Sequence, residues 1–206
     1  MRKVIASEWM TLDGVAQGPS YADEDRSGGF DRGGWHSRYF DERSMKWVIE
    51  SVSNAGGYLL GRGTYELFAA HWPKASAEEQ VLAEPLNTRP KYVASTKLSE
   101  PLEWQNSTLL QGNVGDAVRA LKAQAGADLL LIGSPVLMRT LLEDNLLDEL
   151  RVMIDPLVLG AGKRLFGTDV STRPLRLVES QPTSTGAIIA TYAGADLAAA
   201  KKEDNG

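Results

Sequence analysis

Three short polar segments of this sequence combine glycines, hydroxyls and basic side chains in patterns that suit the binding of phosphate groups. The first contains Gly61, Arg62, Gly63 and Thr64, directly after the apolar run YLL. Glycines let backbone amides approach a phosphate, the start of a helix offers unpaired N–H groups, and arginine and threonine add a cation and a hydroxyl. The third glycine of the dinucleotide fingerprint is missing, so a plain turn remains the alternative interpretation.

The second segment contains Ser95, Thr96 and Lys97 and follows the strand-like run KYVA. Two hydroxyls and an ammonium group are able to hold a phosphate monoester. A solvated surface loop is the alternative, because turns of this composition are common on protein surfaces.

The third segment contains Gly133, Ser134 and Pro135 and follows the apolar run DLLLI. A serine at the N-cap and a proline at the first helical position are typical of a helix start, so capping alone explains the triplet. We expect DLLLI to be a central strand, buried on both faces. That position favours a binding role, because ligands of open α/β sheets bind beyond the carboxyl ends of the strands.

The composition disfavours several other kinds of site. The 206 residues include no cysteine, which excludes disulfides and thiolate metal sites and suits a cytoplasmic setting. His36 and His71 have no acidic pairs near them in the sequence, so no metal site is expected. The net charge of −5 argues against a nucleic-acid partner, and no apolar run is long enough for a membrane span.

Apolar periodicity indicates the elements that position these segments. Strands are expected at residues 3–9, 56–61, 91–95, 107–110, 128–132, 149–155, 174–180 and 187–193, and helices at 39–53, 64–70, 76–86, 114–124 and 135–143. Strands and helices alternate until the last two strands, which should form a hairpin. The pattern predicts an α/β domain over residues 1–195, with a mostly parallel central sheet and an antiparallel C-terminal edge. Residues 196–206 are expected to be a disordered tail.

The order of motifs resembles the dihydrofolate reductase family, in particular the reductase domain of bacterial riboflavin-pathway deaminase-reductases. The resemblance covers about residues 2–193, and it is carried by the motifs MTLDG, LLGRGTYE, HWP, KYVASTKL, LLLIGSPVLMRTLL and LLDELRVMIDPLVLGAGKRLF. The resemblance implies a dihydrofolate reductase-like three-layer sandwich. It also implies an NADPH-dependent oxidoreductase, similar to 5-amino-6-(5-phosphoribosylamino)uracil reductase or to dihydrofolate reductase.

The resemblance assigns cofactor roles to the three polar segments. In the family, the turn at Gly61–Thr64 contacts the cofactor phosphates, and the turn at Ser95–Lys97 receives the adenosine 2′-phosphate, which implies NADPH rather than NADH. A glycine pair in the family seats the pyrophosphate, and it corresponds here to Gly133 and Ser134. The replaced glycine and the missing N–H of Pro135 bear on cofactor affinity, not on the fold.

The same resemblance places the substrate between the loop after the first strand and the helix that follows. It points to Thr11, Leu12, Asp13 and Gly14 in the loop. True dihydrofolate reductase carries a carboxylate on the helix, and Met45 falls near that position here, so folate is not the expected substrate.

Reduction by hydride transfer needs no protein nucleophile, but the product needs a proton, from a carboxylic acid or from water. Asp13 is the first candidate for the acid. Glu149, in the DEL segment, is the second, and Glu8 is the third because it follows a buried-looking strand segment. For each of them a solvated or capping carboxylate is the alternative.

The expected function is therefore the NADPH-dependent reduction of a small pyrimidine- or pterin-like substrate of the riboflavin-precursor type. A catalytically idle ligand-binding or regulatory protein on the same fold is the alternative, motivated by Ser134, Pro135 and the missing helix carboxylate. A structural dimerisation module is a third reading. The resemblance and the apolar run IIATY at residues 188–192 predict a homodimer.

Overall fold

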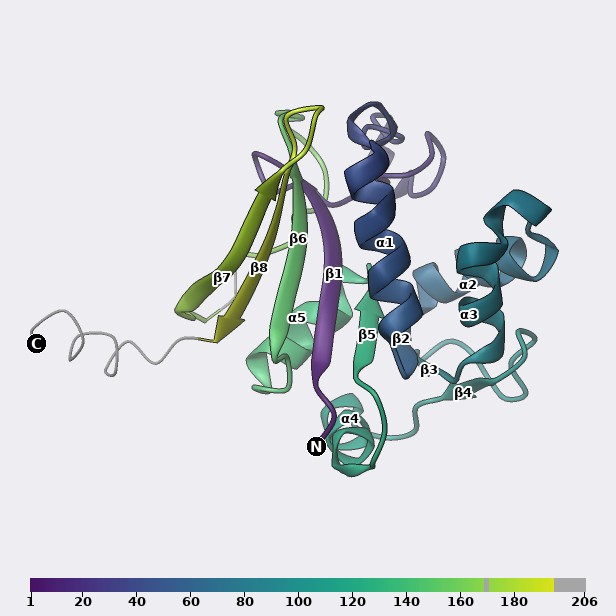
Figure 1. Cartoon of the computed structure of the whole chain (residues 1–206). Helices are drawn as coiled ribbons and strands as arrows, with labels where there is room; N and C mark the ends of the chain where they lie inside the picture. The colour runs from purple at the N-terminus through teal and green to yellow at the C-terminus, as the bar shows by residue number, and fades with distance from the viewer. Residues whose placement is uncertain (169–170, 195–206) are drawn as a thin grey trace, which may run out of the picture.

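All eight strands of the protein belong to one sheet in the computed structural model, which describes residues 1–168 and 171–194 (Figure 1). The strand order across the sheet is β4-β3-β2-β5-β1-β6-β8-β7. The tail expected at 196–206 lies outside the described residues. The strands are β1 (Val4–Thr11), β2 (Gly57–Gly61), β3 (Lys91–Ala94), β4 (Ser107–Leu109), β5 (Leu129–Ile132), β6 (Glu149–Asp155), β7 (Leu175–Pro182) and β8 (Ile188–Gly194).

Neighbouring strands from β4 through to β6 are parallel, whereas β8 pairs antiparallel with both β6 and β7. Parallel neighbours need a crossover connection, and antiparallel neighbours can be joined by a short turn such as the one between β7 and β8. The predicted mostly parallel sheet with an antiparallel C-terminal edge is confirmed. The terminal hairpin is confirmed with it.

The run DLLLI forms β5 between β2 and β1, at the centre of the parallel part of the sheet. Leu129, Leu130 and Leu131 are all buried. Helices cover both faces of a parallel sheet, so a strand in its middle must be apolar on both sides, and the prediction of a central strand is confirmed.

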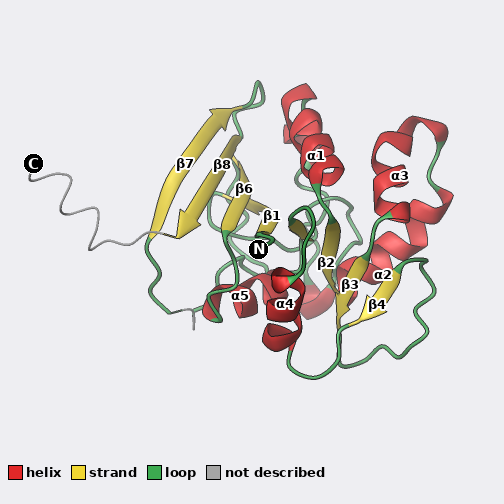
Figure 2. Cartoon of the chain, turned by 60° about the horizontal axis from the view of Figure 1, so that its bottom comes forward, coloured by secondary structure: helices red, strands yellow, loops and turns green. Residues whose placement is uncertain are grey.

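Five α-helices within the described part of the chain complete the three layers: α1 (Glu42–Asn54), α2 (Arg62–His71), α3 (Gln80–Thr88), α4 (Val114–Ala123) and α5 (Pro135–Glu143). Figure 2 shows α1 and α3 on one side of the sheet and α4 and α5 on the other. Val52 of α1, Tyr65 of α2 and Leu86 of α3 share one buried apolar cluster. Val118 of α4 and Leu141 of α5 belong to the cluster on the opposite face.

Two helices begin at different residues from those expected. α1 begins at Glu42 rather than at residue 39, because Asp41 is its N-cap and its carboxylate accepts a hydrogen bond from the amide of Ser44 at 2.9 Å. α2 begins at Arg62 rather than at Thr64, directly after Gly61. The N-terminus of α2 therefore lies at the very end of β2, which matters for the site described below.

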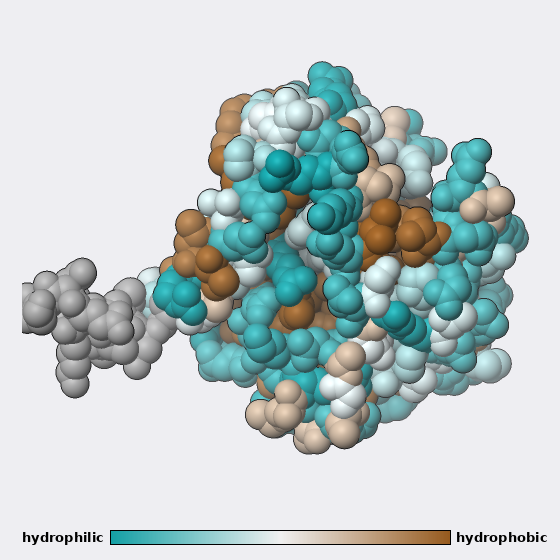
Figure 3. All heavy atoms as spheres, viewed as in Figure 1, coloured by the Kyte–Doolittle hydropathy of each residue, from teal (hydrophilic) through white to brown (hydrophobic). Residues whose placement is uncertain are grey.

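The outer edge of the sheet exposes apolar side chains. β7 is exposed along its whole length and carries Leu175, Leu177 and Val178, and Figure 3 shows apolar surface along this edge. In the IIATY run, by contrast, Ile189 and Ala190 are buried in β8, so core packing accounts for much of its apolar character. Among the described residues, no helix has the length and apolarity that crossing a bilayer requires.

Candidate functional site

A cleft of about 1480 Å³ opens along the carboxyl-terminal ends of β2, β3 and β5 and beside the middle of β1. These strands are parallel, so the loops that leave them meet at one edge of the sheet. Pockets for one drug-sized ligand have volumes of roughly 300–1,000 Å³. The cleft is therefore large enough for a dinucleotide beside a second small molecule.

The junction between β2 and α2 forms one wall of this cleft. Gly61, Arg62, Gly63 and Thr64 all line it. No side chain of the described residues caps α2, and a Cβ added to Gly63 would meet none of their atoms within 4 Å, so the backbone there faces open space. The first N–H groups of a helix have no intrahelical partner, and the helix dipole makes this end positive. The geometry suits an anion.

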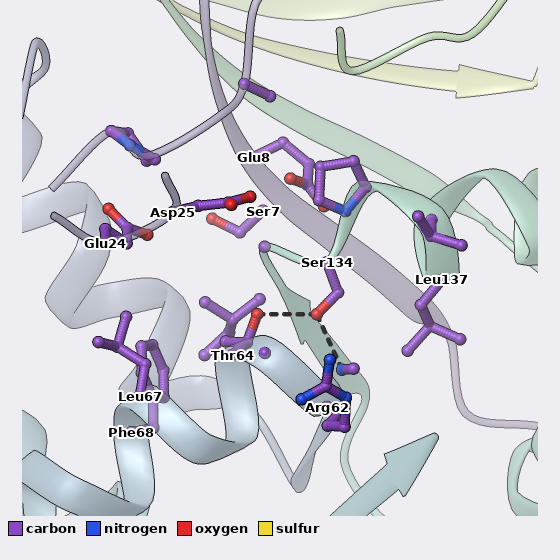
Figure 4. A pocket seen from close by; sticks show the side chains of 18 of the residues that line it. Ser7, Glu8, Glu24, Asp25, Arg62, Thr64, Leu67, Phe68, Ser134 and Leu137 are labelled. Carbon is purple, nitrogen blue, oxygen red and sulfur yellow. Dashed lines mark hydrogen bonds between the residues drawn. The ribbon is translucent and has the colours of Figure 1, made fainter. Parts of the chain in front are cut away.

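The junction between β5 and α5 forms the facing wall, and Ser134 joins it to the first (Figure 4). The Ser134 Oγ accepts a hydrogen bond from the amide of Gly61 at 2.8 Å and lies 2.8 Å from the Thr64 Oγ1. Ser134 has a left-handed backbone, with φ of 59°, and its side chain does not cap α5. The predicted N-cap position of Ser134 and first helical position of Pro135 are therefore confirmed, but the Ser134 hydroxyl reaches across to the neighbouring junction instead of capping α5.

Glycines allow the two junctions to pack this closely. A Cβ on Gly61 would lie 2.8 Å from the Ser134 Oγ, and a Cβ on Gly133 would lie 3.3 Å from the Thr64 Oγ1. Gly133 also has a positive φ of 55°, which L side chains rarely adopt. The N-termini of α2 and α5 consequently face the same part of the cleft.

The turn after β3 reaches the same cleft through Ser95, Thr96 and Lys97. The Ser95 Oγ accepts hydrogen bonds from the amides of Lys97 and Leu98, at 3.0 and 3.1 Å, and so shapes the turn. Thr96 and Lys97 are exposed. All nine residues to which the sequence assigned cofactor binding thus line one cleft, although that role itself stays a prediction.

Asp13 does not line the cleft and instead ties two loops together. Its carboxylate accepts hydrogen bonds from the Thr11 hydroxyl at 2.6 Å and from the amides of Leu159 and Gly160, at 3.1 and 2.8 Å. These bonds, the one from Thr11 foremost, lower the pKa of Asp13 to about 2. A carboxylate that is ionised at neutral pH is a poor proton donor, so the expectation that Asp13 supplies the proton is corrected.

The other expected substrate residues form the base of the same loop. The Thr11 Oγ1 also accepts from the amide of Val15 at 3.0 Å, and the Gly14 carbonyl accepts from the amide of Leu165 at 2.8 Å. The Leu12 side chain is 62% exposed. Neither Thr11, Leu12 nor Gly14 lines the cleft. Later residues of the loop do so, among them Gln17, Pro19, Glu24 and Asp25.

Glu149 lies at the wrong end of the sheet for a role in the cleft. It is the first residue of β6, which runs parallel to β1, so it sits at the amino edge while the cleft lies toward the carboxyl edge. It forms ion pairs with Lys3 at 2.8 Å and Arg151 at 3.0 Å. These bonds lower its pKa against the opposing effect of partial burial. The expectation that Glu149 is catalytic is corrected.

Glu8, the third candidate acid, lines the cleft. Its side chain is 3% exposed, and its Oε1 has no hydrogen-bond partner among the residues that the structure describes. Burial raises the pKa of Glu8 well above the usual 4.5, and the charge of Arg139 opposes that shift only in part. Glu8 is thus the one of the three candidate acids that combines access to the cleft with a raised pKa.

α1, which lies wholly within the described residues, presents apolar side chains to the cleft. Met45 and Val48 line it, together with Phe40 just before the helix. Asp41 is occupied in capping the helix, and its second oxygen accepts from the amide and hydroxyl of Ser184, at 2.8 and 2.7 Å. Met45 thus lies in the cleft, and its correspondence to the helix carboxylate of dihydrofolate reductase stays a prediction from the sequence.

Sequence reasoning missed a buried histidine–aspartate contact behind the cleft. The His36 Nδ1 lies 2.8 Å from the Asp155 Oδ2, with both side chains almost fully buried. The His36 ring stacks on Trp9, which lines the cleft, with ring centroids 4.3 Å apart. His36 and Asp155 are 119 positions apart, and no local sequence pattern links them. Among the described residues, no group of three or more histidine, aspartate or glutamate side chains is placed to hold a metal ion.

Comparison with known proteins identifies relatives in sequence. A profile of the RibD C-terminal domain family matches residues 2–189. Among curated proteins, the uncharacterised protein YyaP of Bacillus subtilis (strain 168) is 33% identical over 137 residues, which are 65% of this chain and 71% of YyaP.

Three solved structures share the fold. A putative riboflavin biosynthesis protein from Shewanella sp. PV-4 has a TM-score of 0.71 at 21% identity, covering 94% of this chain and 99% of that one. A pyrimidine reductase-like protein from Corynebacterium diphtheriae has a TM-score of 0.59 at 15% identity, covering 95% and 92%. Dihydrofolate reductase from Enterococcus faecalis, complexed with NADP(H) and RAB-propyl, has a TM-score of 0.60 at 13% identity, covering 94% and 97%.

At these identities the structural matches establish a dihydrofolate reductase-like fold, as the sequence predicted. The match to the family profile is one of sequence rather than of fold, and it covers nearly the whole described chain. It falls on a family of NAD(P)H-dependent reductases. The chain therefore belongs to the RibD C-terminal domain family.

Proposed function

We propose that the protein is an NADPH-dependent reductase that transfers a hydride to a small pyrimidine- or pterin-like heterocycle. The observation that carries this proposal is the convergence of three strand ends on one cleft. Nine residues from the ends of β2, β3 and β5 line it, and the hydroxyl of Ser134 holds two of the junctions together.

The residues of the two joined junctions fit a pyrophosphate. The N-termini of α2 and α5 both border the cleft, and anions bind at helix N-termini. The open backbone at Gly63 would let phosphate oxygens approach the amides of α2. Pro135 contributes no N–H, so α2 carries more of this contact than α5.

Exposed cations and hydroxyls at the end of β3 suit the adenosine 2′-phosphate of NADPH. Thr96 and Lys97 extend into the cleft there, and Arg62 lies on the neighbouring strand end. Arg62 pairs with Glu66 at 2.8 Å, but both side chains are about half exposed. Exposed ion pairs of this kind contribute little to stability, so Arg62 can leave Glu66 and turn toward a phosphate at low cost.

The strand order sets the direction of the dinucleotide. β3, β2, β5 and β1 follow one another across the sheet. With the 2′-phosphate at β3 and the pyrophosphate over β2 and β5, the remaining end of the dinucleotide reaches β1. When bound there, the nicotinamide supplies the hydride, and Ser7, Glu8 and Trp9 border that end of the cleft.

The apolar face of α1 suits a flat heterocyclic substrate beside the nicotinamide. Phe40, Met45 and Val48 form this side, and Pro19 and Ser20 of the long loop also line the cleft. The absence of a carboxylate from the cleft-facing part of α1 favours a riboflavin-precursor-type pyrimidine over folate. The role of these residues is to hold the acceptor carbon close to the hydride donor and to exclude water.

Titration with NADPH, followed by fluorescence, tests the cofactor assignment. Gly63→Asp places a carboxylate against the phosphates and should abolish binding, whereas Gly63→Ala fits the open space and should keep it. No binding by the unmodified protein at millimolar NADPH would refute the proposal. Binding without NADPH oxidation across a panel of pterins, pyrimidines and quinones would favour the catalytically idle alternative.

We also propose that the protein forms a homodimer through β7. This strand pairs with β8 on one side and ends the sheet on the other, and its side chains are exposed on both faces. An edge strand with exposed Leu175, Leu177 and Val178 is a template for pairing with another strand. A second copy offers the same edge, as a two-fold symmetric interface requires.

A further inference from the structure

Glu8 occupies an unusual position for an acidic side chain. It lies in the interior of β1, opposite Val152 of the neighbouring β6, and its carboxyl group is buried without a hydrogen bond to Oε1 among the described residues. A buried, unpaired carboxylate is costly, so such a group normally keeps its proton. It still lines the cleft, and Figure 4 shows it between Ser7 and the start of α5.

The charged groups around Glu8 do not neutralise it. Arg139 of α5 favours the ionised form, but its guanidinium donates hydrogen bonds to the carbonyls of Arg164 and Leu165, at 3.2 and 3.1 Å. On the loops that border the cleft, Asp25 and Lys163 pair with each other at 2.7 Å. The effect of burial therefore dominates, and the pKa of Glu8 is raised.

Glu8 is also next to the junction proposed to hold the pyrophosphate. The carbonyl of Ser7, the preceding residue, accepts a hydrogen bond from the amide of Gly133 at 3.2 Å. A dinucleotide that extends from this junction toward β1 brings its nicotinamide to the part of the cleft that Glu8 lines. The ring of that nicotinamide is uncharged when reduced and carries a positive charge when oxidised.

We propose that Glu8 is the proton donor of the reaction and that its ionisation is coupled to the charge of the nicotinamide. Glu8 is a neutral acid beside the reduced ring and a carboxylate beside the oxidised ring. This inference rests on the proposed function, because it requires a nicotinamide at this end of the cleft.

The proton balance of this step is simple. The substrate is a heterocycle with a C=N or C=O bond, whose carbon receives the hydride with its electron pair. The O–H bond of Glu8 breaks, and its proton goes to the nitrogen or oxygen of that bond. The resulting carboxylate lies beside the positive charge of the oxidised nicotinamide until the oxidised cofactor leaves, and it then takes up a proton from solvent. When the oxidised cofactor binds alone, the proton of Glu8 goes to solvent.

The test is the dissociation constants of NADP⁺ and NADPH, measured by calorimetry as a function of pH. The 2′-phosphate titrates near pH 6 in both cofactors, so the ratio of the two constants isolates the charge of the nicotinamide. At pH values below the pKa of Glu8 in the free protein, the affinity for NADP⁺ relative to NADPH should rise about tenfold for each unit by which the pH is raised. This is the dependence expected when NADP⁺ binding releases one proton. In Glu8→Gln this ratio should not change with pH.

Glu24→Gln is the matched control, because Glu24 is a second carboxyl in the cleft whose pKa is raised by burial. The pH dependence should survive in Glu24→Gln, and its loss there would overturn the assignment. Proton release can also be counted in the unmodified protein, from heats in buffers of different ionisation enthalpy, whether or not the variants fold. If NADP⁺ and NADPH release the same number of protons on binding, the role of Glu8 is refuted. If NADPH does not bind, the proposed function itself is refuted.

Discussion

The amide of Gly61 donates a hydrogen bond to the Ser134 Oγ at 2.8 Å, although the two residues are 73 positions apart in the sequence. The same oxygen lies 2.8 Å from the Thr64 hydroxyl. One serine thus fixes the spacing between the N-termini of α2 and α5. The proposed pyrophosphate site depends on this spacing, because it uses both helix ends.

Ser134→Ala is expected to destabilise the protein by about 1–2 kcal/mol, because it leaves the partly buried amide of Gly61 without its partner. Ser134→Gly should cost less stability, since glycine adopts the left-handed backbone of this position without strain. Urea unfolding of the three proteins measures both effects. Equal stability of Ser134→Ala and the unmodified protein would contradict the structural role of the bond.

Lys97→Ala should weaken NADPH binding about tenfold, because it removes a charge-assisted contact to the 2′-phosphate. NADH has no 2′-phosphate, so its dissociation constant should stay the same. Fluorescence titration of both cofactors provides the comparison. A similar loss for NADH would place Lys97 away from the 2′-phosphate.

Asp13→Asn should destabilise the protein at neutral pH, because the ionised carboxylate joins the loop after β1 to the amides of Leu159 and Gly160. The pKa of Asp13 is about 2 in the folded protein, below the ordinary value of 3.8. A lowered pKa gives stability that is present above pH 3.8 and is lost as pH falls through about 2.

The stability difference between the unmodified protein and Asp13→Asn should therefore shrink below pH 3.8. Melting temperatures at a series of pH values test this. A difference that does not change with pH would show that the ionised form has no special role.

Val178→Lys should convert the proposed dimer into a monomer, because it places a charge on the exposed edge strand β7. Val81→Lys is the matched control, since Val81 is a similarly exposed valine on α3. Sedimentation velocity gives the masses. A monomeric unmodified protein, or a dimer that survives Val178→Lys, would rule out this interface.

Much of the fold follows from local sequence pattern. Apolar runs such as DLLLI, alternating with amphipathic segments, specify strands and helices through contacts between residues close in the chain. The alternation implies a parallel sheet, and a parallel sheet brings loops from the same ends of its strands together. For this reason the sequence by itself identified the three polar segments at Gly61, Ser95 and Gly133 that share the cleft.

The tertiary structure decided which acid faces the cleft and what Ser134 does. Asp13, Glu149 and Glu8 are all acidic residues that the sequence alone does not distinguish as proton donors, because their protonation depends on neighbours far along the chain. Asp13 meets amides some 146 positions away, Glu149 meets Lys3, and Glu8 is buried where α5 begins. Ser134 looks like a helix cap in the sequence, and only the approach of Gly61 across the sheet turns its hydroxyl into a bridge. Burial and long-range hydrogen bonds, which set these roles, exist only once the sheet has assembled.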